Sequence, residues 1–359
     1  MSRIDRYISL LFWGYFAGAI LVFVTIFAAV DAMSMLVNYK DVSTTALAEY
    51  YLYYTPEVLH KMLPVACLLA TILTLSNLNK SNELISLFAS GMSLFRVAAP
   101  ILVWVGIICG VGYWAADQAL PRLAVQKNYI FYHEIKKRPS AFSTIKTNKI
   151  WYRSKNAIFN IKTLSPQGDV AQGLSLYFFD EDWNLLQMLS ADKVRLAGKN
   201  WQLSDGTVTI FTADSSFPLT SKFKNKTIVM GEEAQDLQNS GQTSEMLSQE
   251  ELKKFIEKNS EAGLDTLAYQ VDYHAKIGFA FTGLVLALLG IPFSVSRARS
   301  GSAMLNLGIC LGLVFAYYVL NSSAITLAQH GAMPPWLGGW AANGVMAAMA
   351  YSFLKRTNY

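Results

Sequence analysis

The sequence predicts an α-helical membrane protein with six transmembrane helices and an outward-facing β-sandwich or jelly-roll domain inserted between helices three and four. Two observations predict this class. Hydrophobic residues make up 53% of the 359 residues and charged residues only 15%, against roughly 25% charged in an ordinary globular protein. The apolar residues also collect toward the two ends of the chain and leave a polar middle. The composition therefore argues against a wholly soluble protein.

Six stretches free of charged side chains are long enough to cross a membrane. A helix needs roughly 20 such residues to span a hydrocarbon core about 30 Å thick. In lipid, a helix lets such a segment satisfy its own backbone hydrogen bonds. Pro334-Pro335 suits the start of the last helix, where the missing N–H of proline costs nothing. The six stretches are Ile8–Val30, Met62–Leu78, Val97–Ala116, Ile277–Val295, Ser302–Ala328 and Trp336–Leu354.

The basic residues of the short connections predict how the chain crosses the membrane. Such residues stay on the cytoplasmic side. The connections that would lie opposite contain only Lys40 and Lys61. Both termini and the two short basic links are therefore expected to be cytoplasmic, and the polar middle to face outward. The basic residues on the expected cytoplasmic side are Arg3, Arg6, Lys80, Arg96, Arg297, Arg299, Lys355 and Arg356.

The polar middle reads first as β structure and then as a helix. Aromatic and β-branched runs over residues 150–153, 157–161, 174–179 and 207–211 predict short strands. Turns are predicted at 180–184, at 198–200 and at Asp205-Gly206. Strands about ten residues apart indicate a β-sandwich or jelly roll. Ser248 begins a predicted capping-box helix with Leu252, Phe255 and Ile256 on one face.

These elements define the expected domains. Residues 1–121 would hold helices one to three, residues 122–271 the outward β domain with its helical C-terminal segment, and residues 272–359 helices four to six.

Signatures of catalysis, cofactor binding and metal binding are missing from the sequence. It has no phosphate-binding loop of the form G-x-x-x-x-G-K-[ST], no H-E-x-x-H and no G-x-S-x-G. The three cysteines lie in apolar stretches, and the four histidines are far apart. A net charge of +5 is too mild to indicate nucleic-acid binding. We therefore expect neither an enzyme nor a cofactor, a metal or a nucleic-acid partner.

The short link between spans two and three is the most informative stretch. Asn79 or Ser81 is expected to cap a short helix, with Glu83 in its first turn. Two interpretations stay open: a helix that lies among lipid headgroups, and a helix that docks into a groove of a cytoplasmic partner. The polar face carries an acid and small neutral residues instead of Lys and Arg, which favours docking. The residues expected on one face are Leu84, Leu87, Phe88 and Gly91.

At this point the sequence resembles a known family. The opening Asp5-Arg6-Tyr7-Ile8 and the link Glu83-Leu84 … Ala89-Ser90-Gly91 are similar to those of the LptF/LptG permeases of the lipopolysaccharide-export ABC transporter. The layout of three spans, an outward β domain and three spans is similar as well. The opening looks more like the LptG member.

The resemblance implies a permease subunit of the bacterial inner membrane with a periplasmic jelly roll. In that family two different permeases pair above two copies of a separate ATPase, LptB, and the β domain joins a bridge of LptC and LptA. Lipopolysaccharide enters between the permeases, and spans one and five line the gates. The link is the coupling helix, about residues 80–92. Glu83 matches its acidic position, and the ATPase-binding surface would be Glu83, Leu84, Leu87, Phe88 and Gly91.

Cations near the outer ends of the spans are the candidates for binding lipopolysaccharide phosphates, with anchoring at the membrane interface as the alternative role for each. They are Lys40, Lys61, Arg122 and Lys127. Members of the LptG type carry several lysines at the outer end of span one, whereas this chain has Asp31, Asn38 and a single lysine there. An alternative function, a membrane-anchored periplasmic receptor or assembly scaffold without transport, stays open. It predicts that the link tolerates charge reversal and that the β domain does not.

Overall fold

The computed structural model of the protein divides into two compact units. One unit comprises Met1–Asp41, Ala48–Ala124 and Leu267–Tyr359, and the other comprises Val42–Leu47 and Val125–Thr266. The structure describes residues 2–39, 43–136, 150–154, 157–164, 170–180, 183–197, 200–211, 217–230, 244–261, 265–296 and 303–356.

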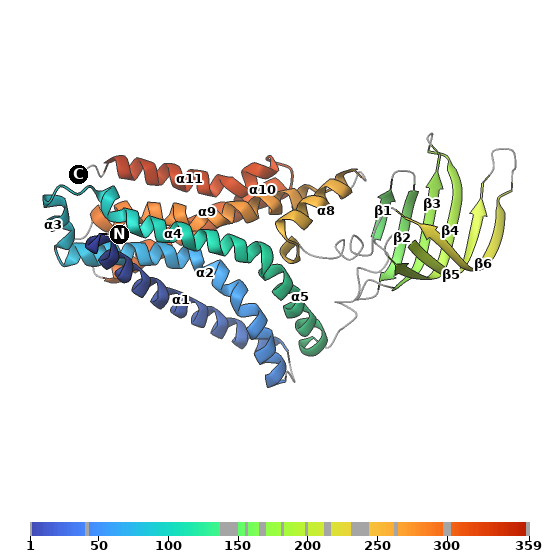
Figure 1. Cartoon of the computed structure of the whole chain (residues 1–359), viewed down its shortest axis with the longest axis horizontal. Helices are drawn as coiled ribbons and strands as arrows, with labels where there is room; N and C mark the ends of the chain where they lie inside the picture. The colour runs from blue at the N-terminus through green and yellow to red at the C-terminus, as the bar shows by residue number, and fades with distance from the viewer. Residues whose placement is uncertain are drawn as a thin grey trace. The chain divides into compact units, whose positions relative to one another are not determined.

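The first unit is a helical bundle (Figure 1). The helices that correspond to the six predicted spans are α1 (Arg3–Asn38), α2 (Thr44–Lys80), α4 (Leu94–Gln118), α9 (Leu267–Ser296), α10 (Ala303–Gln329) and α11 (Pro335–Arg356). The first five have stretches long and apolar enough to cross a membrane. α11 has 22 residues but falls short in apolarity, since Trp336, Trp340 and Asn343 replace aliphatic side chains. As predicted, this helix begins at the second proline of the Pro334-Pro335 pair.

Several helices continue well beyond their apolar runs. α1 runs to Asn38, α2 already begins at Thr44, and α9 begins ten residues before Ile277. Periodicity alone could not place these ends, because the added turns carry mixed polar and aromatic residues. Figure 1 shows the start of α1, the end of α11 and the short helix α3 (Glu83–Ala89) at the same end of the bundle. The start of α1, the end of α11 and the link helix α3 thus share one end of the bundle.

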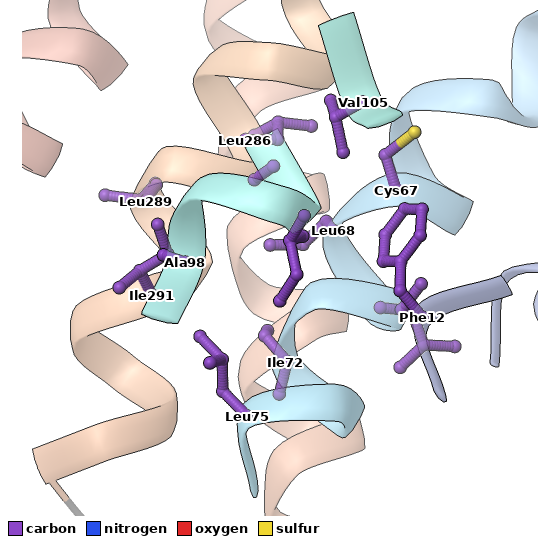
Figure 2. Close-up of a cluster of buried hydrophobic side chains, with 14 of the residues drawn as sticks. Phe12, Cys67, Leu68, Ile72, Leu75, Ala98, Val105, Leu286, Leu289 and Ile291 are labelled. Carbon is purple, nitrogen blue, oxygen red and sulfur yellow. The ribbon is translucent and has the colours of Figure 1, made fainter. Parts of the chain in front are cut away.

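The core of the bundle is built mainly from α2, α4 and α9. Leu68, Ile72 and Leu75 of α2 are buried, and their spacing places them on successive turns of one helix face. Figure 2 shows these side chains directed toward Ala98 of α4 and toward Leu286 of α9, with Phe12 of α1 closing one side. This close packing sets the positions from which α3 and the first turns of α1 and α4 extend.

α9 and α11 approach each other so closely that only glycine fits. A Cβ on Gly278 would lie 2.1 Å from the carbonyl oxygen of Gly339. Beside this contact the Asn343 Nδ2 donates to the Gly278 oxygen at 2.6 Å. Thr282 Oγ1 lies 2.7 Å from the hydroxyl of Tyr317, which belongs to α10. Small residues and buried hydrogen bonds are the usual means of joining helices in a membrane, and here they join the last three helices.

The described residues of the second unit contain one antiparallel sheet of six strands in the order β1-β2-β3-β4-β5-β6. The predicted strands are confirmed. The predicted jelly roll is not found, because each described strand pairs with its sequence neighbours, whereas a jelly roll requires Greek-key crossings. Short connections allow each strand to return beside the previous one. The strands are β1 (Ile150–Ser154), β2 (Ala157–Leu164), β3 (Val170–Phe179), β4 (Leu185–Ala197), β5 (Asn200–Ile210) and β6 (Leu219–Val229).

The turn predicted at Asp205-Gly206 is wrong. Both residues lie inside β5, where pairing with β4 and with β6 continues on either side. Asp205 adopts φ 54°, which aspartate tolerates better than most residues. Gly206 leaves no room for a side chain, since a Cβ would lie 2.2 Å from the Ser190 oxygen. Pairing on both edges of the strand therefore outweighs the local preference for a turn.

The strands on either side of the other two predicted turns pair with each other, while residues 181–182 and 198–199 of those turns lie outside the described residues. Asp180 and Asn184 close the β3–β4 connection with a 3.0 Å backbone hydrogen bond, and Ala197 pairs with Asn200 between β4 and β5. One face of the sheet supplies a separate apolar core around Phe159, Leu176 and Trp201. These buried side chains give the sheet an apolar core of its own, which stabilises its fold.

Helices flank the sheet in the sequence. α5 (Leu120–Ile130) and a π-helical turn (Phe131–Ile135) precede it, in a stretch that the sequence assigned to the β domain without specifying an element. α8 (Gln249–Glu261) follows it, after a short 3₁₀ turn at Ser244–Met246. The capping box of α8 is confirmed, because the Ser248 backbone N–H donates to Glu251 Oε2 at 2.8 Å and the Glu251 N–H donates to Ser248 Oγ at 3.3 Å. Leu252 is fully buried.

Candidate functional site

The link between α2 and α4 forms a short helix whose start differs from the prediction. Neither Asn79 nor Ser81 caps α3: the first lies within α2, and the Ser81 hydroxyl donates to a carbonyl at the end of that helix. Asn82 occupies the N-cap position with φ 62° and makes no side-chain capping bond. The left-handed conformation at Asn82 lets the chain reverse between two helices separated by only two residues.

Gly91 determines how α3 ends. It adopts φ 85°, its N–H donates to the Phe88 carbonyl at 2.9 Å, and the Met92 N–H donates to the Leu87 carbonyl at 3.1 Å. These two bonds form a Schellman motif, in which glycine is favoured because the left-handed conformation strains other residues. Gly91 therefore fixes where the chain leaves α3.

The apolar face of α3 packs onto the bundle. Leu84 is buried, and Leu87, Phe88 and Met92 pack against the bundle core. Ile85, between these positions, is 50% exposed. Leu84, Leu87 and Phe88 therefore hold the helix in place, and the surface offered to another molecule consists of the outward residues, with Glu83 at one end.

Glu83 lies within a small polar cluster that sequence reasoning had not assembled. The hydroxyl of Tyr7 donates to Glu83 Oε1 at 3.3 Å. Beside it Arg96, at the start of α4, binds both carboxylate oxygens of Asp5, at 2.6 and 3.1 Å. A capping box between Asp5 and Ser2 fixes the first turn of α1. The sequence pattern singles out the opening motif and the link separately. It does not indicate that Tyr7 contacts Glu83, 76 residues away, or that Asp5 contacts Arg96, 91 residues away.

The predicted substrate-binding cations differ in their surroundings. Lys61 is paired with Glu57 on the preceding turn of α2, with 2.7 Å between Nζ and Oε1. Arg122 is exposed and borders a pocket of about 570 Å³ lined also by Trp114, Gln118, Ala119 and Leu123. Lys127 is buried and belongs to the second unit. Lys40 lies outside the described residues.

A carboxylate near the end of α1 forms a contact with α2. Asp31 of α1 accepts a 2.8 Å hydrogen bond from the hydroxyl of Tyr51 on α2. This contact joins α1 and α2 near the end opposite to α3. Tyr50 and Tyr54 lie beside Tyr51, with ring centroids 5.3 and 6.3 Å from it.

Among the described residues, no group of three His, Cys, Asp or Glu side chains is placed to hold a metal ion. The fold and the site define a class of protein: a polytopic membrane protein with an inserted antiparallel sheet and a short helical link that presents a carboxylate at one end of its bundle.

The comparisons with known proteins identify the family. The profile of the lipopolysaccharide export system permease family LptF/LptG matches residues 6–356, and the chain belongs to that family. Its relatives include the lipopolysaccharide export system permease protein LptG of Haemophilus influenzae, 22% identical over 277 residues that cover 74% of this chain and 73% of the relative. The LptG protein of Escherichia coli K12 is 23% identical over 308 residues, 80% of this chain and 79% of the relative.

Proposed function

We propose that the chain is the LptG-type permease subunit of an ABC transporter that extracts lipopolysaccharide from the bacterial inner membrane and passes it to a periplasmic bridge. A second LptF/LptG-type permease completes the membrane part, and an LptB-type ATPase dimer supplies the energy. Both termini and α3 face the cytoplasm, and the sheet faces the periplasm, where it meets proteins of the LptC and LptA type. The family match over nearly the whole chain carries this proposal.

The sequence and the position of α3 support the involvement of a separate ATPase. The chain has no phosphate-binding loop that could hold a nucleotide. Instead α3 projects at one end of the bundle and is anchored on the core by Leu84, so that a force on the link reaches the packed helices. Glu83 would bind a basic side chain of the ATPase, a contact that gives register and orientation more than raw affinity.

The substrate contacts are proposed from the chemistry of lipopolysaccharide. Lipopolysaccharide combines acyl chains with phosphates, and its extraction requires apolar helix faces near a cation. α1 and α10 expose much of their apolar surface, with Leu21 67% and Phe315 72% exposed. Such surface fits lipid, a second permease or the substrate. Arg122 supplies the cation, beside the apolar ring of Trp114.

The decisive experiment measures ATPase association and lipopolysaccharide export for Glu83→Ala and Glu83→Arg. Charge reversal is expected to weaken copurification of the ATPase with the permease pair and to reduce export, because like charges then face each other at the contact. The matched control is Glu250→Arg on α8, an exposed glutamate of the second unit. If association and export both survive Glu83→Arg unchanged, the coupling role is wrong. Tolerance of Glu83→Arg would instead support a receptor or scaffold.

A further inference from the structure

Three segments distant in sequence meet around Glu83: the first turns of α1, the start of α3 and the start of α4. Tyr7 reaches Glu83 through its hydroxyl, with 3.3 Å between the oxygens. The two terminal nitrogens of Arg96 donate to the two carboxylate oxygens of Asp5, at 2.6 and 3.1 Å. Nothing in the function proposed above uses Asp5 or Tyr7, although both belong to the opening motif of the chain.

We propose that Tyr7 is a positioning residue for Glu83, and that the Asp5–Arg96 ion pair locks the start of α1 to α4, so that a cation binding Glu83 acts directly on α1. This inference rests on the proposed function, in which the cation belongs to the ATPase. Tyr7 touches neither substrate nor nucleotide and acts through the carboxylate that it holds.

The geometry at Glu83 suits this role. The carboxylate has two oxygens, and Tyr7 occupies Oε1. Within the described part of the chain no side chain bonds to Oε2, which leaves that oxygen for the incoming cation. A glutamate on a surface helix samples several rotamers, and fixing one of them before binding removes an entropy cost from the binding step. The hydrogen bond from Tyr7 therefore fixes the rotamer of Glu83 before the cation binds.

The packing of α1 explains why the contact would be felt far away. The buried side chains of its first half are Ile8, Ser9, Phe12, Phe16 and Ala19, whereas Leu21, Ile26 and Val30 are exposed. Most of the buried side chains of α1 thus lie in the half near α3, and the far half carries an exposed apolar side together with two attachments, buried Met35 and the Asp31–Tyr51 hydrogen bond. A helix of 36 residues is about 54 Å long at 1.5 Å per residue. Movement at the start of α1 would therefore be transmitted along the helix to the Asp31–Tyr51 contact at its other end.

The ion pair supplies the second attachment. A two-pronged arginine–carboxylate contact fixes orientation as well as distance. It joins α1 to the first turn of α4, immediately after the link that carries Glu83. Movement of α3 would therefore reach α1 by two routes, the tyrosine hydroxyl and the ion pair, and not through the apolar core alone.

The test of Tyr7 is a double-mutant cycle in the assembled permease pair, reconstituted in nanodiscs and titrated with the purified ATPase. Tyr7→Phe removes only the hydroxyl, and we expect it to weaken ATPase binding by about threefold to tenfold, the range for losing one ordinary hydrogen bond. In a Glu83→Gln background the same change is expected to have little effect, because the carboxylate that it positions is gone. Tyr351→Phe, an exposed tyrosine near the end of α11, is the control and should leave binding unchanged.

The outcomes separate this inference from the proposed function. If Glu83→Gln weakens binding but Tyr7→Phe does not, or if Tyr7→Phe weakens it equally in both backgrounds, the positioning role is wrong while the coupling role stands. If Glu83→Gln itself has no effect, the coupling role fails first.

The test of the ion pair is a charge swap with lipopolysaccharide released per ATP as its readout. Asp5→Arg and Arg96→Asp are each expected to lower this ratio, because each leaves two like charges in contact. The double variant Asp5→Arg with Arg96→Asp should recover most of it, since the pair is restored in reverse. A general loss of folding would lower expression of all three variants and would not be rescued by the swap. Equal ratios for the singles and the wild type, or a double variant as poor as the singles, would overturn the role of the pair.

Discussion

The close contact between α9 and α11 makes a quantitative prediction about Gly278. Alanine at this position would place a Cβ 2.1 Å from the Gly339 carbonyl oxygen, a backbone atom that no rotamer change can move. Ordinary carbon contacts lie at about 3.5–4.0 Å, so the two helices must separate by more than about 1 Å. Overpacking of this kind costs about 1–3 kcal/mol.

The separation would also disturb a hydrogen bond. Asn343 Nδ2 donates to the oxygen of Gly278 itself at 2.6 Å, and hydrogen bonds between membrane helices are worth about 0.6 kcal/mol on average. Together the two effects predict a loss of roughly 2–4 kcal/mol. At about 2–4 °C per kcal/mol, the apparent melting temperature of the purified protein should fall by roughly 4–16 °C.

The matched control is Gly344 on α11, the helix that Gly278 of α9 contacts. No atom lies within 4 Å of the point that a Cβ on Gly344 would occupy, so Gly344→Ala should leave the melting temperature unchanged or raise it slightly. Thermal scans in one detergent, followed by size-exclusion chromatography, compare the two variants. If Gly278→Ala melts as high as Gly344→Ala, the glycine contact does not determine the packing of these helices.

Two further predictions concern the substrate and the sheet. Arg122→Gln should reduce photocrosslinking of lipopolysaccharide more than Lys61→Gln does, because Lys61 is already paired with Glu57 whereas Arg122 borders an open pocket; equal losses would contradict this ranking. Gly206→Val should open the β4–β5 pairing and make the full-length protein more sensitive to limited proteolysis, since a Cβ there meets the backbone of Ser190. Thr207→Val on the same strand is the control and should stay resistant.

Much of the bundle could be predicted from the sequence, since lipid imposes a simple rule on an uncharged stretch. All six expected spans are helices, and α11 begins at the predicted proline. The ends of α1, α2 and α9 could not be predicted. Outside the hydrocarbon a helix continues or stops according to its contacts, and the hydropathy of the added turns does not report those contacts.

In the sheet and in the link, tertiary contacts override the structure that the local sequence pattern predicts. Asp205-Gly206 has the composition of a turn, yet strands on both sides keep it within β5. In the link, the amphipathic pattern predicted an apolar docking face. The structure turns Leu84 and its neighbours onto the bundle and leaves Ile85 outward. A hydrophobic pattern tells which residues seek burial, but not whether the burying surface belongs to the same chain.

The sequence by itself determined the class of this protein: the number of apolar runs, the side of the basic residues and the presence of an inserted β domain all follow from composition along the chain. Only the tertiary structure decided which residues surround Glu83. Tyr7 lies 76 residues from Glu83, and Asp5 lies 91 residues from Arg96. Such contacts depend on how three helices pack, and packing is a property of surfaces brought together by folding, which no local spacing encodes.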